Sequence, residues 1–445
     1  MKILIIVLLS IQNFKTLKMK NTILLILLLF LPGVLIAQQR DLNFYLEQAK
    51  INSPLINKNK NENKIAELDL KQIRSILSKP EVNLEANVLF APIVSHDNNS
   101  NHFEWTSDGA DNYSGYDLAL TDGGHYQAFV SVKQPLLTGS KYRIYSNYED
   151  ISRQTNENSI ALTIHELEQL VSYQYILCLK SRKQSEISSD LVKELKNQLL
   201  IMQKLVENAI YKQTDLMLLQ IEYQNYEVES RTFQAEYQNN LYDLNLISGI
   251  NDKNLVEVQE INFQLKSDIH ANSQFLTSYK LDSLNIITEQ SINELKYKPQ
   301  ISLFADAGLN AAYLPSFNRL GFSSGIAFSW NIFDGNQREI QREKSTINLQ
   351  TIEFEKKNFI TQNDIYKNKI LDQINSLDQR LKIIEEQTDQ YDQLYNAYRK
   401  ELSQGEVSVI DFKNVLKDIF AKKQEGLLLM MDKQLLINSY NYWNY

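Results

Sequence analysis

Glycine, proline and cysteine are scarce in this chain of 445 residues, and each scarcity excludes a class of structure. There are 13 glycines and 7 prolines, and the stretch from Ser140 to Ser248 contains neither residue. Because glycine and proline are the main helix breakers, this favours long uninterrupted helices. The single cysteine, Cys178, excludes a disulfide framework within the chain, and we expect it to be a small buried apolar residue.

The N-terminus has the pattern of a secretion signal. A short basic start at Met19 is followed by the apolar run Ile23–Ile36, with Ala37 as the last residue before cleavage. The apolar run, about 14 residues, is shorter than a membrane-spanning helix requires. We therefore predict a signal peptide over residues 1–37. Met19 is the alternative start, because residues 1–18 carry a second apolar run.

The chain also lacks an excess of basic residues. Its 46 lysines and arginines are outnumbered by 54 acids, which gives a net charge of −8. Because residues 1–37 hold four lysines and no acid, the mature chain carries about −12. This charge disfavours nucleic acid as a partner.

An internal repeat organises the rest of the sequence. LLTGSKYRI matches IFDGNQREI, which places Gly139 and Gly335 at an offset of 196 residues. TDLMLLQIEYQ matches IDFKNVLKDIF, and Asp215 and Asp411 share the same offset. Upstream, KPEVNLEANV matches KPQISLFADA at an offset of 219, so the first copy holds 23 extra residues, in the polar loop 95–124. Each copy reads as helix, strand, loop, strand, very long helix, turn and helix.

The helical segments are long and periodic. Residues 336–404 contain no glycine or proline, and such a helix would be roughly 100 Å long. Apolar residues recur at heptad-like spacing on both sides of a break near Tyr211. We predict antiparallel helical hairpins over 138–248 and 334–435. The remaining helical and connecting segments are N-terminal helices at 38–79, a helix at 272–298, an equatorial segment at 249–271 and an aromatic tail at 436–445.

Four segments alternate between apolar and polar residues, which predicts β-hairpins over 80–137, with an outer loop at 95–124, and over 299–333. One face of these strands collects the apolar residues Val82, Leu84, Ala86, Val88, Tyr126, Ala128, Val130, Val132, Ile301, Leu303, Ala305, Ala307, Leu309, Phe322, Ile326, Phe328, Trp330 and Ile332. Strands of this length and period suit a membrane β-barrel, although an ordinary half-buried sheet alternates in the same way. Four strands cannot close a barrel, so membrane strands would require oligomerisation, with twelve strands from three chains or eight from two.

The sequence resembles the TolC-like outer membrane efflux proteins over essentially the whole mature chain. The resemblance depends on LNFYLEQAKINSP, on the two strand entries, on the QPLLTG and WNIFDG joints, and on the tips NAIYKQTDLMLLQ and SQGEVSVIDFKNVL. It implies a mainly α fold with transmembrane β-structure: four membrane strands per chain, a twelve-stranded barrel in a homotrimer, and long periplasmic helical hairpins in two repeats. It further implies an outer membrane channel of a Gram-negative bacterium. That channel serves tripartite efflux or type I secretion as a passive exit duct, together with a periplasmic adaptor protein and an inner-membrane pump.

The same resemblance places the candidate site at the helical tips. Asp215 and Asp411 lie one turn inside two tips per chain, so threefold symmetry would gather six carboxylates near the narrow end. Such a ring in a confined pore selects cations and binds divalent ions. The alternative is that each aspartate stabilises the first turn of its helix. Family members often have a second acid one turn later, where this chain has Asn414.

Two further pairs complete the candidate site residues. Gly405 resembles the turn glycine of the family, whereas the first tip has Ala209 or a neighbouring residue in its place. Gly139 and Gly335 are expected at the joints between strand and helix.

We expect no metal, cofactor or catalytic site. The loop 95–124 holds six acids and no basic residue, which is typical of a solvated acidic loop. A calcium site at Asp108, Asp111 and Asp117, or a metal at His96 and His102, is the less favoured interpretation. Catalytic motifs are missing, so a secreted enzyme is disfavoured. The main alternative to a duct is a secreted coiled-coil structural or adhesin-like surface protein.

Overall fold

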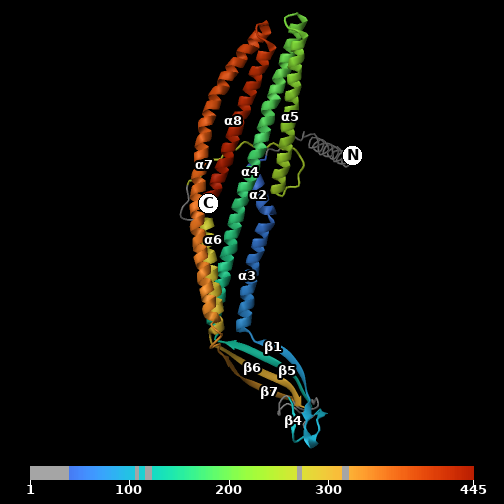
Figure 1. Cartoon of the computed structure of the whole chain (residues 1–445), viewed down its shortest axis with the longest axis vertical. Helices are drawn as coiled ribbons and strands as arrows, with labels where there is room; N and C mark the ends of the chain where they lie inside the picture. The colour runs from blue at the N-terminus through green and yellow to red at the C-terminus, as the bar shows by residue number, and fades with distance from the viewer. Residues whose placement is uncertain (1–39, 106–109, 116–122, 268–272, 313–319) are drawn as a thin grey trace, which may run out of the picture.

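The structure is a computed structural model that describes residues 40–105, 110–115, 123–267, 273–312 and 320–445. The expected signal peptide and three of the six loop acids, Asp108, Asp117 and Asp122, lie outside these residues. Figure 1 shows a long helical bundle with a β-sheet at one end and the turns between its longest helices at the other. In the described part of the chain, no helix combines the length and the apolarity that a membrane crossing needs.

Two very long helices run through the bundle. Helix α4 (Gly139–Glu207) has 69 residues and helix α7 (Gln337–Gln404) has 68, so each is roughly 100 Å long. Each is followed by a returning helix of 35 residues, α5 (Gln213–Ile247) or α8 (Val409–Trp443), that packs against the half nearer the tip. The long helical hairpins expected from the sequence are therefore present, with one arm twice the length of the other.

Shorter helices cover the half of each long helix that lies nearer the sheet. Helix α3 (Pro54–Ser78) packs against α4, and helix α6 (Gln274–Glu294) packs against both α4 and α7. Helix α2 (Leu42–Asn52) precedes α3 and contacts α4 and α5. Its first turn is capped by Asp41, which accepts a hydrogen bond from the backbone N–H of Phe44 at 2.9 Å.

Helix α8 continues to Trp443, so the segment 436–445 is mostly the end of this helix and is not the separate tail that the sequence suggested. Its aromatic residues pack on the bundle. The rings of Tyr442 and Tyr445 stack on His165 of α4, with centroid distances of 5.1 and 3.7 Å. Phe275 of α6 closes the same cluster. This packing holds the end of α8 and the two residues after it against the bundle.

The four main strands form one antiparallel sheet in the order β1-β5-β6-β7. Their bounds are β1 (Glu81–Ala91), β5 (Gly123–Leu136), β6 (Gln300–Ala312) and β7 (Leu320–Ser329). Strand β7 ends at Ser329, which pairs with Gln300 at the start of β6. Trp330 and Ile332, expected on the strand, therefore lie in the joint, because β6 offers no further partner.

The register places the apolar residues of all four strands on one face. Leu84 pairs with Val130, Val130 with Ala307, and Ala307 with Phe322. One step away, the row on the opposite face consists of Asn83, Ser131, Asp306 and Ser323. Leu84 and Phe322 are 78% and 80% exposed, so no described residue covers this part of the apolar face. The sheet therefore has one uncovered apolar face and one polar face.

The loop at the far end of the sheet contains a small second sheet that the sequence did not predict. Strands β2 (Ile93–Ser95), β3 (His102–Glu104) and β4 (Tyr113–Ser114) pair in the order β3-β2-β4. The short helix η1 (Asp97–Asn99) follows β2. The Asp97 carboxylate accepts hydrogen bonds from the backbone N–H groups of Asp111 and Asn112 at 2.8 and 2.9 Å.

The equatorial segment between α5 and α6 has little regular structure and is held by side chains of the helices. Tyr175 donates to the carbonyl of Gln259, and Tyr237 donates to the carbonyl of Val256, each at 2.7 Å. Val258 is fully buried in the core cluster formed there by α2, α4, α5 and α8. Segment 249–267 is thus tied to the middle of the bundle.

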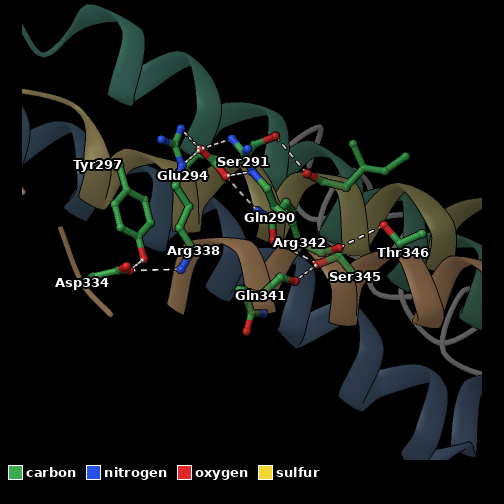
Figure 2. A network of polar contacts seen from close by, with 11 residues as sticks. Gln290, Ser291, Glu294, Tyr297, Asp334, Arg338, Gln341, Arg342, Ser345 and Thr346 are labelled. Atoms are coloured by element: carbon green, nitrogen blue, oxygen red, sulfur yellow. Dashed lines mark hydrogen bonds and ion pairs between the residues drawn. The ribbon is translucent and has the colours of Figure 1, made fainter. Parts of the chain in front are cut away.

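A polar cluster fixes the joint between the sheet and the second long helix (Figure 2). Glu294, in the last turn of α6, accepts hydrogen bonds from Nε of Arg338 and of Arg342 at 2.9 and 2.7 Å. Tyr297 donates its hydroxyl to Asp334, and the Arg338 guanidinium lies over the Tyr297 ring at 5.0 Å. The hydrogen bonds from Arg342 and Arg338 lower the pKa of Glu294 to about 2, although partial burial opposes this shift.

We predict that Glu294→Gln loosens this joint. Losing the charge that holds two guanidinium groups should lower the local opening free energy by about 1 kcal/mol, since the arginines are half exposed. Hydrogen exchange of the amides in 334–345 measures this opening. The folded structure lowers the pKa of Glu294 from its ordinary value of 4.5 to about 2. The contribution of the Glu294 charge to the opening free energy is therefore present above about pH 4.5 and is lost as the pH falls toward 2.

Glu353→Gln is the matched control for this prediction. Glu353 lies on α7, the helix that carries the two arginines, and within the described chain its only ion pairs are exposed ones with the neighbouring Lys356 and Lys357. Its replacement should leave exchange at 334–345 unchanged. Equal effects of the two substitutions, or a Glu294→Gln effect that persists near pH 2, would contradict the assigned role.

Candidate functional site

Both helical hairpins turn with the same backbone geometry at the tip. Ala209 and Gly405, which are 196 residues apart, adopt left-handed conformations with φ of 60° and 79°. In the first turn, the N–H groups of Ala209 and Ile210 donate to the carbonyls of Val206 and Leu205. The second turn repeats this pair of hydrogen bonds with the N–H groups of Gly405 and Glu406. This arrangement satisfies the last carbonyls of a helix and favours glycine at the left-handed position.

The two turns of one chain are tied together. The hydroxyl of Tyr211 donates to the carbonyl of Val407 at 2.6 Å. A Cβ atom at Gly405 would lie 2.6 Å from Cγ2 of Ile210, so the second turn fits against the first only without a side chain there. Burial raises the pKa of Tyr211, and the charge of Asp215 raises it further. Sequence reasoning missed this tie, although the offset of 196 also relates Tyr211 to Val407.

A common apolar core lies directly behind the tips. It draws buried residues from four helices: Leu195 and Met202 from α4, Leu219 and Tyr226 from α5, Leu402 from α7, and Val409, Phe412, Leu416 and Phe420 from α8. These include positions of the heptad-like seam. The core makes the two tips a single packed unit.

The two candidate acids occupy equivalent helix positions but have different partners. Asp215 is the third residue of α5, and its Oδ2 accepts a hydrogen bond from the N–H of Lys212 at 3.0 Å. At the second tip the N–H of Asp411 donates to the hydroxyl of Ser408 at 3.1 Å, so serine supplies the cap. Asp215 thus has the helix-stabilising contact of the alternative interpretation. In the described residues, the Asp411 carboxylate makes no hydrogen bond and is exposed, as is Asn414 one turn later on the same face.

The histidines of the outer loop bind side chains of the small sheet. His96 contacts Oδ1 of Asn101 at 2.8 Å and the hydroxyl of Ser114 at 2.7 Å. His102 contacts the hydroxyl of Ser100 at 2.6 Å. Among the residues that the structure describes, no three His, Cys, Asp or Glu side chains are grouped to hold a metal ion.

The polar face of the main sheet carries two phenylalanines, each packed over a glycine of the next strand. Phe129 pairs with Gly308 and Phe304 pairs with Gly325. A Cβ at Gly308 would lie 2.5 Å from Cβ of Phe129, and one at Gly325 would lie 2.7 Å from Cζ of Phe304. The rings can therefore lie against the sheet. A shallow hollow of about 330 Å³ lies beside Phe129, and Asp306 is among the residues that line it.

The two joints between strand and helix share sequence but differ in geometry. Gly335 and Asn336 both adopt left-handed conformations, with φ of 70° and 67°. Gly139 has no positive φ and is the first residue of α4. In the first joint the left-handed residue is Leu137, with φ of 55°. The repeat therefore predicted where the joints lie but not which residue makes each turn.

Comparison with known proteins shows which solved structures share the fold of this chain. No protein-family model and no curated protein matches this sequence. Among solved structures, the transmembrane channel protein CusC has a TM-score of 0.69 at 13% identity, covering 92% of each chain. The CmeC outer membrane channel of Campylobacter jejuni has a TM-score of 0.67 at 12% identity, covering 91% of this chain and 85% of its own.

The outer membrane protein VceC of Vibrio cholerae has a TM-score of 0.65 at 14% identity, covering 91% of this chain and 96% of its own. The fold of this chain, sheet and helices together, is thus similar to the folds of these three solved structures over 91–92% of its length. The fold implied by the resemblance to TolC-like proteins is confirmed.

We predict that Ala209→Gly stabilises the first tip. Glycine adopts the left-handed conformation without the Cβ clash, so the local opening free energy should rise by about 0.5–1 kcal/mol. Slower hydrogen exchange at residues 205–216 would report the gain.

Gly405→Ala is the reciprocal substitution. It adds the strain of a left-handed alanine and a close contact with Ile210. The local opening free energy of the second tip should therefore fall by about 1–2 kcal/mol, and hydrogen exchange there should become faster. Faster exchange in Ala209→Gly, or no change in Gly405→Ala, would contradict the shared turn geometry.

Proposed function

We propose that this chain is the subunit of an outer membrane exit duct, a channel-tunnel through which solutes or polypeptides leave a Gram-negative cell. Three copies would supply a twelve-stranded barrel across the outer membrane, and their helices would extend into the periplasm. The duct is passive and has no enzymatic activity. A periplasmic adaptor and an inner-membrane pump, the partners that the TolC-like resemblance implies, supply the energy and open the tip.

The observation that carries this proposal is the main sheet. Strands β1 and β7 each have an edge that pairs with no other strand in the described chain. The apolar face, which includes Leu84 and Phe322, is uncovered. Lipid can cover such a face, but open edges are not tolerated there. Pairing β7 of one chain with β1 of the next satisfies both requirements at once.

Three copies suit a duct better than two. An eight-stranded barrel is just wide enough for its own side chains to fill, whereas more strands leave a lumen. The polar face of this sheet already holds Phe129 and Phe304. Twelve strands leave room for a wetted path past them.

The helical bundle gives the duct its length and its closed end. Helices of roughly 100 Å attached to one end of the sheet must all lie on one side of the membrane. In a trimer, the three copies of Asp215 and Asp411 lie near the axis at the far end, where we place the gate. Asp411 is the stronger candidate for a pore charge, because Ser408 already supplies its helix cap.

A secreted coiled-coil structural or adhesin-like protein is the alternative. This alternative accounts for the long helices, but it does not explain why the sheet exposes an apolar face. The mass of the detergent-solubilised particle separates the two, since a water-soluble monomer would exclude the duct.

We predict that cysteines on β1 and β7 form disulfides between chains. Within one chain β5 and β6 separate these strands, by about 14 Å, which exceeds the reach of a disulfide. Ser323→Cys should be combined in turn with Asn83→Cys, Glu85→Cys and Asn87→Cys, all on the polar face. In one register, oxidation should produce a covalent trimer on a non-reducing gel.

The single-cysteine variants are the controls, because one site per chain has no partner across a threefold axis. The natural Cys178 is fully buried and should not react. A covalent dimer as the end product would indicate an eight-stranded barrel and contradict the trimer. If none of the three cysteine pairs forms a cross-link, the proposed closure of the barrel between β7 and β1 is contradicted.

We predict that Asp215→Asn with Asp411→Asn weakens divalent-ion block of the channel. Asparagine keeps an oxygen that can cap the helix at Lys212, so the substitution removes charge while keeping the fold. Single-channel conductance in planar bilayers should rise, and block by divalent cations at the tip side should decrease.

Asp190→Asn, an exposed acid on α4 paired with Lys193, is the matched control and should leave block unchanged. If the double variant is blocked like the natural chain, the two acids have only their helix-stabilising role.

A further inference from the structure

An aromatic cluster lies exposed at the end of the sheet farthest from the helices. Phe90, Phe103 and Trp105 are 51%, 61% and 65% exposed. The ring centroids of Phe90 and Trp105 are 4.8 Å apart, and those of Phe103 and Trp105 are 6.1 Å apart. With the exposed Val94, these residues form what we call the aromatic platform.

The platform is not the core of the small sheet. Ala91, Ile93 and Ser95 alternate with the platform residues and are 4%, 1% and 2% exposed, so they form the packed side. The hydrogen bond between His96 and Ser114, and the one that Asp97 accepts from the N–H of Asp111, hold the loop without using the platform side chains. The small sheet therefore presents its aromatic side outward without needing it for its own packing.

The platform continues the apolar face of the main sheet. Phe90 lies on β1 at the same parity as Val82, Leu84 and Val88, which are all exposed on that face. From Val82 to Phe90 the strand rises about 26 Å, or roughly 20 Å along the membrane normal at the usual tilt. The apolar band of membrane barrels is about 25 Å tall, so the platform falls at its outer border.

The opposite border of the same face also carries exposed aromatic residues. Trp330 and Phe333, in the second joint, are 52% and 80% exposed. Tryptophan and phenylalanine prefer the border between acyl chains and headgroups, where an apolar ring meets a wet layer. The two groups therefore bracket the apolar face.

We propose that the small sheet β2–β3–β4 is a membrane-interface anchor, with Phe103 and Trp105 inserted at the headgroup border of the outer leaflet. The proposal rests on the proposed function, because it requires the main sheet to lie in the membrane. The anchor fixes how deeply the barrel sits in the membrane. The occupant of the platform is the lipid surface, since the platform is continuous with the lipid-facing side.

The three tryptophans of the chain, Trp105, Trp330 and Trp443, allow a direct test. Three proteins each keep one tryptophan and have phenylalanine at the other two sites. They are reconstituted in phosphatidylcholine vesicles with acyl chains brominated close to the headgroup. Bromine should quench Trp105 and Trp330, whereas Trp443, packed beside Tyr366 and Tyr442 at the end of α8, should keep its emission.

The outcomes separate this inference from the proposed function. Quenching of Trp330 without quenching of Trp105 overturns the anchor, whether Trp105 is then in water or against a neighbouring chain. Lack of quenching at both sites contradicts the membrane barrel itself. If a single-tryptophan protein does not fold, Trp105→Phe in the natural chain serves instead. It should remove the share of the lipid-quenchable emission that comes from Trp105 and leave the share from Trp330, and unchanged quenching would overturn the anchor.

Discussion

An antiparallel sheet of four strands leaves two edges of unpaired backbone groups, and in this chain those edges belong to β1 and β7. The register also gathers most apolar side chains of the four strands on one face, which no other part of the described chain covers. A single copy can satisfy neither the edges nor the face. The proposed assembly, in which neighbouring copies close the sheet in lipid, would satisfy both.

The duplication transmits that constraint into the helices. Each strand pair continues into one very long helix, and a returning helix of half its length supports only the part nearer the tip. The other half is supported by α3 or α6, and the equatorial segment is bonded to the middle of the bundle. The two repeats differ at the joints between strand and helix. At the second joint Arg338 and Arg342 hold Glu294. In the first repeat the positions of these two arginines are taken by Tyr142 and Ser146, so the first joint has no such clamp.

The tip shows how one motif can carry two roles. Asp215 and Asp411 hold equivalent positions, yet Lys212 cannot cap a helix and Ser408 can. The first acid is therefore engaged by the backbone, and the second is exposed, as the pore charge that we propose would require. Tyr211 binds the second turn at Val407, so the two tips of one chain move as a unit. Opening of such an end would be a displacement between chains.

The sequence by itself determined the repeat, the long helices, the strand faces and the positions of both tips, because breaker spacing and period are local properties of the chain. It did not reveal the clamp on Glu294, the tie between Tyr211 and Val407, the left-handed Leu137 or the small sheet in the outer loop. The clamp and the tie depend on contacts between segments far apart in the sequence. The turn at Leu137 follows Leu136, whose partner Ile301 lies at the start of β6, so pairing with β6 ends there. Only the tertiary structure decided them, since it alone brings side chains from the two repeats to one joint and one tip.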